Sequence, residues 1–348
     1  MTKLVFHITP HGPGLNVGNF AISKAIRSLL REINPDINIL TIDAHGEKKL
    51  SGLNKQVVHE ANLYGSGILV GGGNLYENNE LIVDRNAIKS LQVPLGLFSI
   101  SIGRIYNNKM QLERRTDVMP DDVIKDLHKI SKFSLSRDLA TYNHLESLKV
   151  KNNKLGLCPT LFLNDYFESS NRFNDVGKND TLLVIRNPEL MNIPIATKPK
   201  VAQFIKDTYF KLAKTKPNIK VVCNDMRDIS FVNSIGIPKY IYTGEVDEYL
   251  TRLKNASLVI SLRLHATLPC LSFGTRCINL SYDERSMSLM NSMGLEDWDI
   301  KVISSKNLYK DVLKKIDQIK KYDLMIKNFQ RKVKKYKKIQ LETLKIFS

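Results

Sequence analysis

The sequence predicts an α/β protein of two domains, each built on a parallel sheet, followed by a basic helical tail. Its 348 residues are 43% hydrophobic and 25% charged, which is enough for two hydrophobic cores and excludes a disordered or collagen-like chain. Short β-rich runs alternate with helical stretches, the pattern of a parallel sheet, and this alternation stops and restarts near the middle of the chain. No apolar run approaches the ~18 residues that a membrane-spanning helix needs.

The first half of the chain carries one set of alternating elements. We expect a helix over Phe20–Leu30 and strands at Leu4–Ile8, Ile37–Ile42, Ser66–Val70, Pro94–Ile102, Phe133–Leu135 and Leu155–Leu157. Between Asn164 and Asp180 the composition shifts to Asn, Asp, Ser and Gly, which is typical of an exposed linker. We therefore predict an N-terminal domain over residues 1–165 and a linker over 166–180.

The second half of the chain again alternates predicted strands and helices, and together the two halves predict a cleft. We expect a helix over Lys200–Lys214 and strands at Thr181–Ile185, Ile219–Cys223, Ile241–Thr243, Leu258–Ser261 and Cys277–Leu280. These elements predict a C-terminal domain over residues 181–305. Two such domains in series leave a central cleft between the carboxyl ends of facing sheets, where ligands of open α/β folds bind.

The C-terminal tail, residues 306–348, holds most of the excess positive charge. It has fourteen Lys and Arg residues against four acidic ones, so it contributes +10 of the net charge of +17. Apolar residues recur there at helical spacing, which predicts one or two amphipathic helices. Two interpretations stay open: a helix docked on the body with a solvated lysine face, or peripheral contact with an acidic membrane surface. We expect no nucleic acid, because the tail has few aromatic stacking platforms and no nucleic-acid-binding motif appears elsewhere.

The N-terminus and the cysteines indicate the compartment. Met1-Thr2-Lys3 leads directly into the first strand without the apolar segment of a signal peptide, so we expect a cytoplasmic protein. The four cysteines show no paired Cys-x-x-Cys spacing, which predicts free thiols and no zinc site. We predict no metal and no cofactor.

The segment Leu258–Leu268 is the sharpest local signal for a binding site. A buried strand ends near Ser261 and a helix begins near His265, which places Arg263, His265 and free backbone N–H groups at one helix N-terminus. An arginine fork and a histidine there suit a phosphorylated ligand. The alternative is structural: Arg263 pairs with a nearby acid, and His265 caps the helix.

Polar residues also follow other predicted strands. They comprise the loop Gly12–Asn19, the segment Val70–Leu75 with three glycines, Ser136-Arg137-Asp138 and Tyr282-Asp283-Glu284-Arg285. Such loops line clefts at the carboxyl edge of a sheet. Each also has a structural interpretation: a tight turn at the glycines, an Arg–Asp pair with Asp138 as an N-cap, and acids favoured at the helix that follows Tyr282.

Taken together, these segments resemble the polysaccharide pyruvyl transferase family. Five motifs of that family occur in order, from about Val5 to Gly294. They are Asn16-Val17-Gly18-Asn19, Gly71-Gly72-Gly73-Asn74-Leu75, Ser101-Ile102-Gly103, Arg137-Asp138 and Ser261-Leu262-Arg263-Leu264-His265-Ala266. The resemblance implies two Rossmann-like domains facing a central cleft, similar to GT-B glycosyltransferases. It also implies phosphoenolpyruvate as the donor and a pyruvate ketal on a sugar of a surface polysaccharide, or of its lipid-linked precursor, as the product.

Residue roles follow from this resemblance. We predict that Arg263 and His265 grip the phosphate, that His265 is the acid, and that Arg137 or Arg285 holds the carboxylate. Asp138 and Asp225 are candidates for the base. The other predicted substrate-binding residues are Asn16, Gly18, Asn19, Gly72, Gly73, Asn74, Gly103, Leu264 and Tyr282.

Two departures from the family pattern keep other functions open. Asn19 stands where the family usually has Asp, and Arg285 stands where it more often has Lys, which replaces a point charge by a fork. A nucleotide-sugar-dependent glycosyltransferase on the same fold is the first alternative. A non-catalytic member of a glycan assembly complex, docked through its basic tail, is the second.

Overall fold

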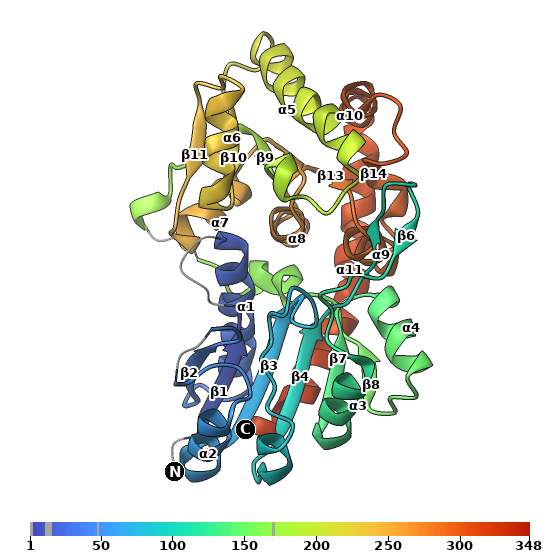
Figure 1. Cartoon of the computed structure of the whole chain (residues 1–348). Coiled ribbons are helices and arrows are strands. Elements are labelled where there is room, and N and C mark those ends of the chain that lie inside the picture. Colours follow the sequence, from blue (N-terminus) through green and yellow to red (C-terminus); the bar gives the residue numbers. More distant parts are fainter. Residues whose placement is uncertain (1–2, 11–15, 47–48, 169–170) are drawn as a thin grey trace.

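The computed structural model describes residues 3–10, 16–46, 49–168 and 171–348. Within them, two parallel sheets lie one above the other, with the cleft region between them (Figure 1). The first sheet has the strand order β2-β1-β3-β4-β7-β8. Its strands are β1 (Leu4–Thr9), β2 (Asn38–Asp43), β3 (Gly67–Gly73), β4 (Leu95–Ile100), β7 (Phe133–Ser136) and β8 (Asn153–Leu155). Its associated helices are α1 (Val17–Ile33), α2 (Lys55–Tyr64), α3 (Asp121–Ile130) and α4 (Leu139–Ser147).

The second sheet has the order β11-β10-β9-β12-β13-β14. Its strands are β9 (Thr181–Ile185), β10 (Ile219–Cys223), β11 (Tyr240–Tyr242), β12 (Leu258–Ser261), β13 (Cys277–Ser281) and β14 (Asp299–Lys301). Its helices are α5 (Lys198–Ala213), α6 (Ile229–Ser234), α7 (Val246–Asn255), α8 (Leu264–Phe273) and α9 (Glu284–Ser292). The antiparallel hairpin of β5 (Ile105–Tyr106) and β6 (Leu112–Glu113) stands between the two sheets (Figure 1).

Short 3-10 helices complete the chain. They are η1 (Ala87–Ser90), η2 (Pro159–Asp165), η3 (Asn171–Phe173), η4 (Pro188–Leu190), η5 (Ile195–Thr197), η6 (Met226–Asp228), η7 (Glu296–Trp298) and η8 (Lys345–Phe347).

The predicted fold class is confirmed, with shifts at individual elements. The strand predicted to end at Val70 continues through the three glycines to Gly73, so these residues form a strand end and not a turn after it. The last strand of the first sheet is Asn153–Leu155, two residues earlier than predicted. The two shifts have different causes. All seven residues of β3 are buried, so the strand continues through the glycines. Leu157, where the other strand was predicted to end, lies in a left-handed conformation (φ 61°) that a strand cannot adopt.

The predicted linker is more closely packed than its composition indicates. Most residues between Asn164 and Asp180 are exposed, but Phe167 and Phe173 are buried. The ring of Phe167 packs against Phe273 of α8, at 5.6 Å between centroids. Two aromatic side chains therefore anchor the predicted linker to the body, and the domain boundaries stay a prediction.

The tail forms two helices, α10 (Leu308–Asp317) and α11 (Ile319–Leu344). Helix α11 runs along both sheets and brings the C-terminus beneath the first one (Figure 1). Buried Gln340 donates to the carbonyl oxygens of Gly156 and Leu157, at 2.7 and 3.2 Å, and the ring of Phe347 lies 6.0 Å from that of Phe133. The apolar side of the tail is thus part of the core, as the docked-helix interpretation expects.

Candidate functional site

The N-termini of α1 and α8 meet between the two sheets. The side chain of Asn16 caps α1 by accepting from Gly18 N at 3.1 Å, and Val17 N donates to the carbonyl oxygen of Asn224, which follows β10, at 2.9 Å. A methyl group on Gly18 would lie 2.6 Å from the Cβ of His265, so only glycine permits this approach. Two helix N-termini, with their positive dipole ends, thus face one region.

Two connected chambers lie at this junction. The inner chamber has about 120 Å³, and the outer one about 450 Å³. Nine predicted residues line the inner chamber: Asn16, Asn19, Asn74, Arg137, Arg263, Leu264, His265, Tyr282 and Arg285. The outer chamber shares Asn16, Asn19, Asn74, Arg263, Tyr282 and Arg285 with it and adds Glu80, Arg115, Arg186 and Arg227. Residues from five separate sequence motifs therefore converge.

Arg137 and His265 line the inner chamber, and each has one buried polar atom without a hydrogen-bond partner among the described residues. These atoms are the Nε of Arg137 and the Nε2 of His265. Burial and the charges of Arg137, Arg263 and Arg285 lower the pKa of His265 to about 3, so its imidazole is neutral at pH 7. Buried donors without partners are costly, and an anionic ligand would satisfy them.

The other arginines of the chambers are held by carboxylates. Arg263 donates to Asp228 and, through Nε, to the carbonyl oxygen of Ile185 at 2.9 Å. Arg285 donates to Glu77 at 2.6 Å and also to Asp283. The acid pairing considered as the structural alternative for Arg263 is therefore present, although its side chain still lines the cavity.

The two base candidates are occupied by structural contacts. Asp138 is buried and caps α4, accepting from Thr141 N and from the hydroxyl of Ser288, both at 3.0 Å. Asp225 accepts from Arg186 at 3.0 Å and from Arg227. Burial acts to raise the pKa of Asp225, but the hydrogen bonds from Arg227 outweigh it and lower this pKa to about 2. A carboxylate with so low a pKa is a weak base.

The predicted glycines act mainly through packing. Gly72 (φ 89°) packs against Ile22 of α1. Gly73 (φ 90°) is the next residue and lies at the buried end of β3. A methyl group on Gly103 would lie 2.5 Å from the Cγ of Arg285, so this glycine makes room for the arginine. Gly18, Gly72 and Gly73 do not line either chamber, and Gly103 lines a different cavity. Residues 11–15 of the predicted cleft loop lie outside the described residues.

Several residues that line the chambers were not predicted from the sequence. Arg186 directly follows β9, and Asn224 directly follows β10. Both strands were predicted, so the position of these two residues at the strand ends could have indicated that they line the site. Glu80 is half-buried, lines the outer chamber and has no ion-pair partner among the described residues. Burial raises the pKa of this carboxyl group above its ordinary value.

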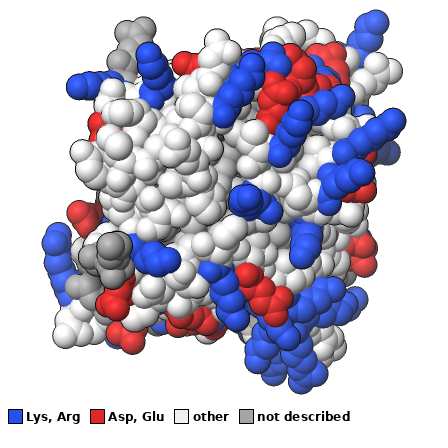
Figure 2. Space-filling model, turned by 90° about the horizontal axis from the view of Figure 1, so that it is seen from below, with Lys and Arg blue, Asp and Glu red and all other residues white. Residues whose placement is uncertain are grey.

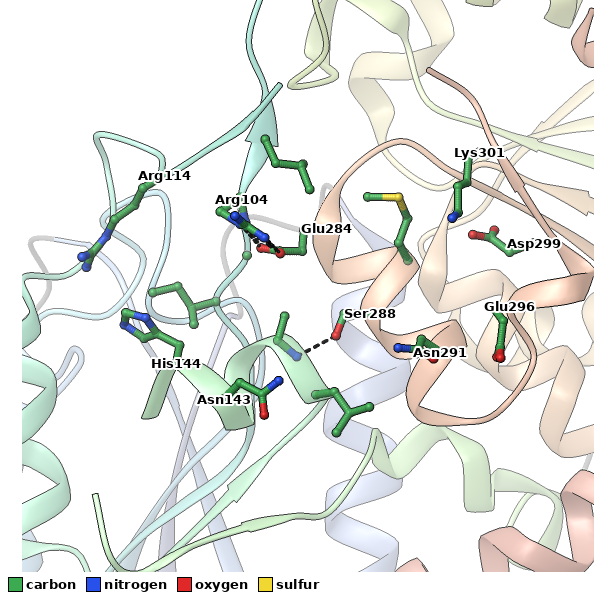
Figure 3. Close-up of a pocket in the computed structure, with 16 residues that line it drawn as sticks. Arg104, Arg114, Asn143, His144, Glu284, Ser288, Asn291, Glu296, Asp299 and Lys301 are labelled. Carbon is green, nitrogen blue, oxygen red and sulfur yellow. Dashed lines mark hydrogen bonds and ion pairs between the residues drawn. The ribbon is translucent and has the colours of Figure 1, made fainter. Parts of the chain in front are cut away.

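A larger cavity of about 910 Å³ is lined by Arg104, Glu284 and residues on either side of this pair (Figure 3). It is formed between α4, α9, the β5–β6 hairpin and the end of β14. Among the residues that the structure describes, no group of three or more His, Cys, Asp or Glu side chains is placed to hold a metal ion.

The comparisons with known proteins agree with this architecture. The S. aureus MnaA–UDP structure superposes with a TM-score of 0.59 at 12% identity, over 93% of this chain and 91% of that one. The Neisseria meningitidis UDP-GlcNAc 2-epimerase bound to UDP-GlcNAc gives 0.53 at 14% identity over 94% of each chain. The spinosyn rhamnosyltransferase SpnG with thymidine diphosphate gives 0.50 at 10% identity, over 95% and 96%. These similarities show a GT-B-like fold.

A search of curated proteins gave no significant match. The model of the family described as polysaccharide pyruvyl transferase matches residues 16–284, which is most of the chain. The matched range contains most of the residues that line the two chambers. Because this match covers more than half of the chain, and four of the five motifs contribute residues to the two chambers, the chain belongs to the polysaccharide pyruvyl transferase family.

Proposed function

We propose that the protein transfers the pyruvyl group of phosphoenolpyruvate to two hydroxyls of a sugar in a surface polysaccharide or its lipid-linked precursor. Family membership supports the reaction class. The choice of phosphoenolpyruvate as the donor rests on two buried groups without hydrogen-bond partners among the described residues, Arg137 Nε and His265 Nε2. Both residues line a chamber of about 120 Å³. A small, densely charged anion satisfies both groups.

The reaction balances without a cofactor. Two hydroxyl oxygens form bonds to C2 of the enol phosphate, the bond between C2 and the phosphate oxygen breaks, and inorganic phosphate leaves with the electron pair. The two hydroxyls lose one proton each: one proton goes to the methylene carbon, which becomes a methyl group, and the other goes to the departing phosphate, which leaves as hydrogen phosphate. The site must therefore supply an acid near the methylene group, a base near the hydroxyls, and cations at the phosphate and carboxylate.

His265 and Arg137 meet the demands of the donor. His265 is neutral in the empty site, and a phosphate dianion beside it would raise its pKa and allow it to carry the proton that the methylene group receives. Arg137 has no competing carboxylate hydrogen bond and is free to bind the ligand carboxylate or phosphate. Arg263 contributes positive charge while Asp228 fixes its orientation.

Glu80 is the best-placed base. It lines the outer chamber, while the carboxylates of Asp138 and Asp225 are occupied. Burial raises its pKa, which makes it a stronger base than an ordinary exposed carboxylate. We place the reacting hydroxyls in the outer chamber beside Glu80, where the Asp that the family usually has at position 19 is absent.

Thermal unfolding with phosphoenolpyruvate tests the donor. Ligands that bind the native state raise its melting temperature, so the wild-type protein is expected to shift and Arg137→Met to shift much less. Arg331→Met, an exposed arginine on α11, is the matched control and should keep the shift. An undiminished shift in Arg137→Met, or no shift in the wild-type protein, would contradict the assignment.

The same assay separates the alternatives. The outer chamber is large enough for a diphosphate and is lined by Arg115, Arg186 and Arg227, and the two structures solved with UDP or thymidine diphosphate share the fold. A shift with a nucleoside diphosphate alone would favour a nucleotide-sugar glycosyltransferase. Ligand binding without turnover on any acceptor would favour a non-catalytic member of a glycan assembly complex.

We place the protein in the cytoplasm, with the tail as its contact to an acidic membrane surface that carries lipid-linked acceptors. No helix among the described residues is both long and apolar enough to cross a bilayer. Between Asp323 and Glu342 helix α11 has no acidic residue, and Lys327, Arg331, Lys332, Lys334 and Lys335 are exposed there. Figure 2 shows a dense group of Lys and Arg side chains along its lower edge, on the side where α11 runs. Such a surface attracts anionic headgroups.

A further inference from the structure

We propose that the cavity of about 910 Å³ binds uncharged sugar residues of the glycan acceptor, next to the reaction chambers. The proposal rests on the proposed function for the identity of the acceptor, but its chemistry comes from the cavity itself. Its volume is in the range of about 300–1,000 Å³ that is usual for ligand sites.

Both halves of the molecule form the cavity. Figure 3 shows Arg114, His144 and Asn143 on one side and Asn291, Glu296, Asp299 and Lys301 on the other, with the Arg104–Glu284 pair between them. The first group comes from the β6 end and α4, and the second from α9, η7 and β14. A ligand held there bridges the two domains.

The charges that line the cavity balance, unlike those of the chambers. Arg104, Arg114 and Lys301 face Glu284, Glu296 and Asp299, and Arg104 and Glu284 are bound to each other at 2.5 Å. By contrast, six arginines line the two chambers, and although carboxylates bind five of them, Arg137 has no ion-pair partner among the described residues. A phosphate is therefore drawn to the chambers, and the larger cavity suits a ligand without net charge.

The remaining side chains match a polyhydroxylated ring. The side chains of Asn143, Asn291 and Glu296 are exposed to the cavity and make no hydrogen bond or ion pair with another described residue. Amides donate to and accept from hydroxyls, and carboxylates accept hydrogen bonds from them. Leu112, Leu139 and Met287 add apolar surface for the C–H face of a sugar. No Phe, Tyr or Trp lines the cavity, so it offers no aromatic platform for a nucleotide base.

Consecutive residues line this cavity and the outer chamber in two places. Arg114 lines the cavity and Arg115 the chamber, and in the same way Glu284 lines the cavity and Arg285 the chamber. A glycan that occupies the cavity is thus positioned to pass its neighbouring sugar over these residues, toward Glu80 and the donor.

Saturation-transfer NMR with neutral glycosides tests this inference. The probes are the methyl glycosides of glucose, galactose and N-acetylglucosamine and their β-linked disaccharides, with the methyl glycoside of glucuronic acid as a charged comparison. We expect at least one neutral probe to bind the wild-type protein. The double variant Asn143→Ala/Asn291→Ala loses several neutral hydrogen bonds to the sugar. It should therefore bind that probe about fivefold to tenfold more weakly than the wild-type protein.

Controls separate this inference from the donor assignment. Asn291→Trp fills the cavity from an exposed position and should abolish the sugar signal, whereas Asn233→Ala, an exposed asparagine on α6, should leave it unchanged. Each variant should retain the melting shift of the wild-type protein with phosphoenolpyruvate if that shift exists, and Arg137→Met should retain the sugar signal. The inference is overturned if no neutral probe binds, if only the glucuronide binds, or if the signal persists in Asn291→Trp.

Discussion

Arg137 and Arg263 line the same inner chamber, but their surroundings give them different tasks. Asp228, a fully buried carboxylate, binds Arg263, whereas Arg137 Nε is buried without a hydrogen-bond partner among the described residues. A paired buried arginine is part of the framework of the site, and an unpaired one is ready for a ligand. For this reason Arg137 is the better residue with which to test donor binding.

Removal of Arg263 should reduce stability as well as binding. Arg263→Ala leaves Asp228 buried and without its main cation, so we expect the free energy of unfolding to fall by about 3–5 kcal/mol. Arg137→Met removes a charge that has no such partner and should cost clearly less. Urea denaturation of both variants checks this, and equal losses would contradict the distinction between them.

The pKa values of two buried histidines predict an acid-dependent loss of stability. Burial lowers the pKa of His265 to about 3 and that of His128 to about 4, below the value of about 6.5 in the unfolded chain. As the pH falls from 6.5 toward these values, the unfolded chain binds protons that the folded protein does not. Each histidine should therefore cost about 1–2 kcal/mol of stability at pH 5 relative to pH 7.

Comparison of variants isolates this effect from the carboxyl groups. Burial raises the pKa values of Asp138 and Glu77, which acts in the opposite direction over the same pH range. His265→Asn should therefore lose less stability than the wild-type protein between pH 7 and pH 5 in denaturant titrations. The exposed His59→Asn serves as the control, and an unchanged slope for His265→Asn would argue against a neutral buried imidazole.

At the scale of elements, the contact between the first turns of α1 and α8 determines the shape of the inner chamber. Gly18 lies against His265, and Val17 donates to Asn224 across the cleft. This contact joins an element of the first sheet to one of the second.

Gly18→Ala should disturb this junction. The added methyl group would lie 2.6 Å from the Cβ of His265, an atom that moves only with its backbone, so α1 and α8 must separate. We expect a stability loss of about 1–3 kcal/mol from overpacking, together with weaker binding of phosphoenolpyruvate. Denaturation and thermal-shift titrations measure both quantities, and Gly244→Ala, where nothing lies within 4 Å, shows the cost of a glycine replacement away from the site.

At the scale of the whole molecule, the tail combines a core role with a charged surface. Deletion of residues 306–348 would remove Gln340 and Phe347 from the core of the first sheet, so a failure to bind membranes after deletion would have two explanations. Charge reversal on the exposed face avoids this problem.

We expect Lys332→Glu/Lys334→Glu/Lys335→Glu to weaken binding to vesicles that contain acidic phospholipid. At about 1 kcal/mol for each basic residue near the surface, the loss is on the order of a hundredfold. Lys125→Glu/Lys129→Glu/Lys132→Glu changes the net charge equally on another exposed face and should bind nearly as well as the wild-type protein. Flotation assays at low and physiological salt provide the measurement; equal losses in both triple variants would indicate a response to net charge alone.

The positions of the strands and the motifs could be read from the sequence, because buried parallel strands and the polar residues that follow them leave a local pattern. The partners of those residues could not. Asp228 lies thirty-five positions before Arg263, and Glu77 lies 208 before Arg285, so neither pairing has a local signal. The same holds for Glu80, which only the fold brings to the outer chamber.

The sequence by itself determined that the protein is a two-sheet α/β chain of the polysaccharide pyruvyl transferase family with a basic helical tail, since local periodicity and ordered motifs carry that information. Only the tertiary structure decided which arginine is free, which carboxylates are occupied and where the cavities lie. These properties depend on contacts between residues far apart in the chain and on the burial that those contacts create, and both arise when the two sheets pack together.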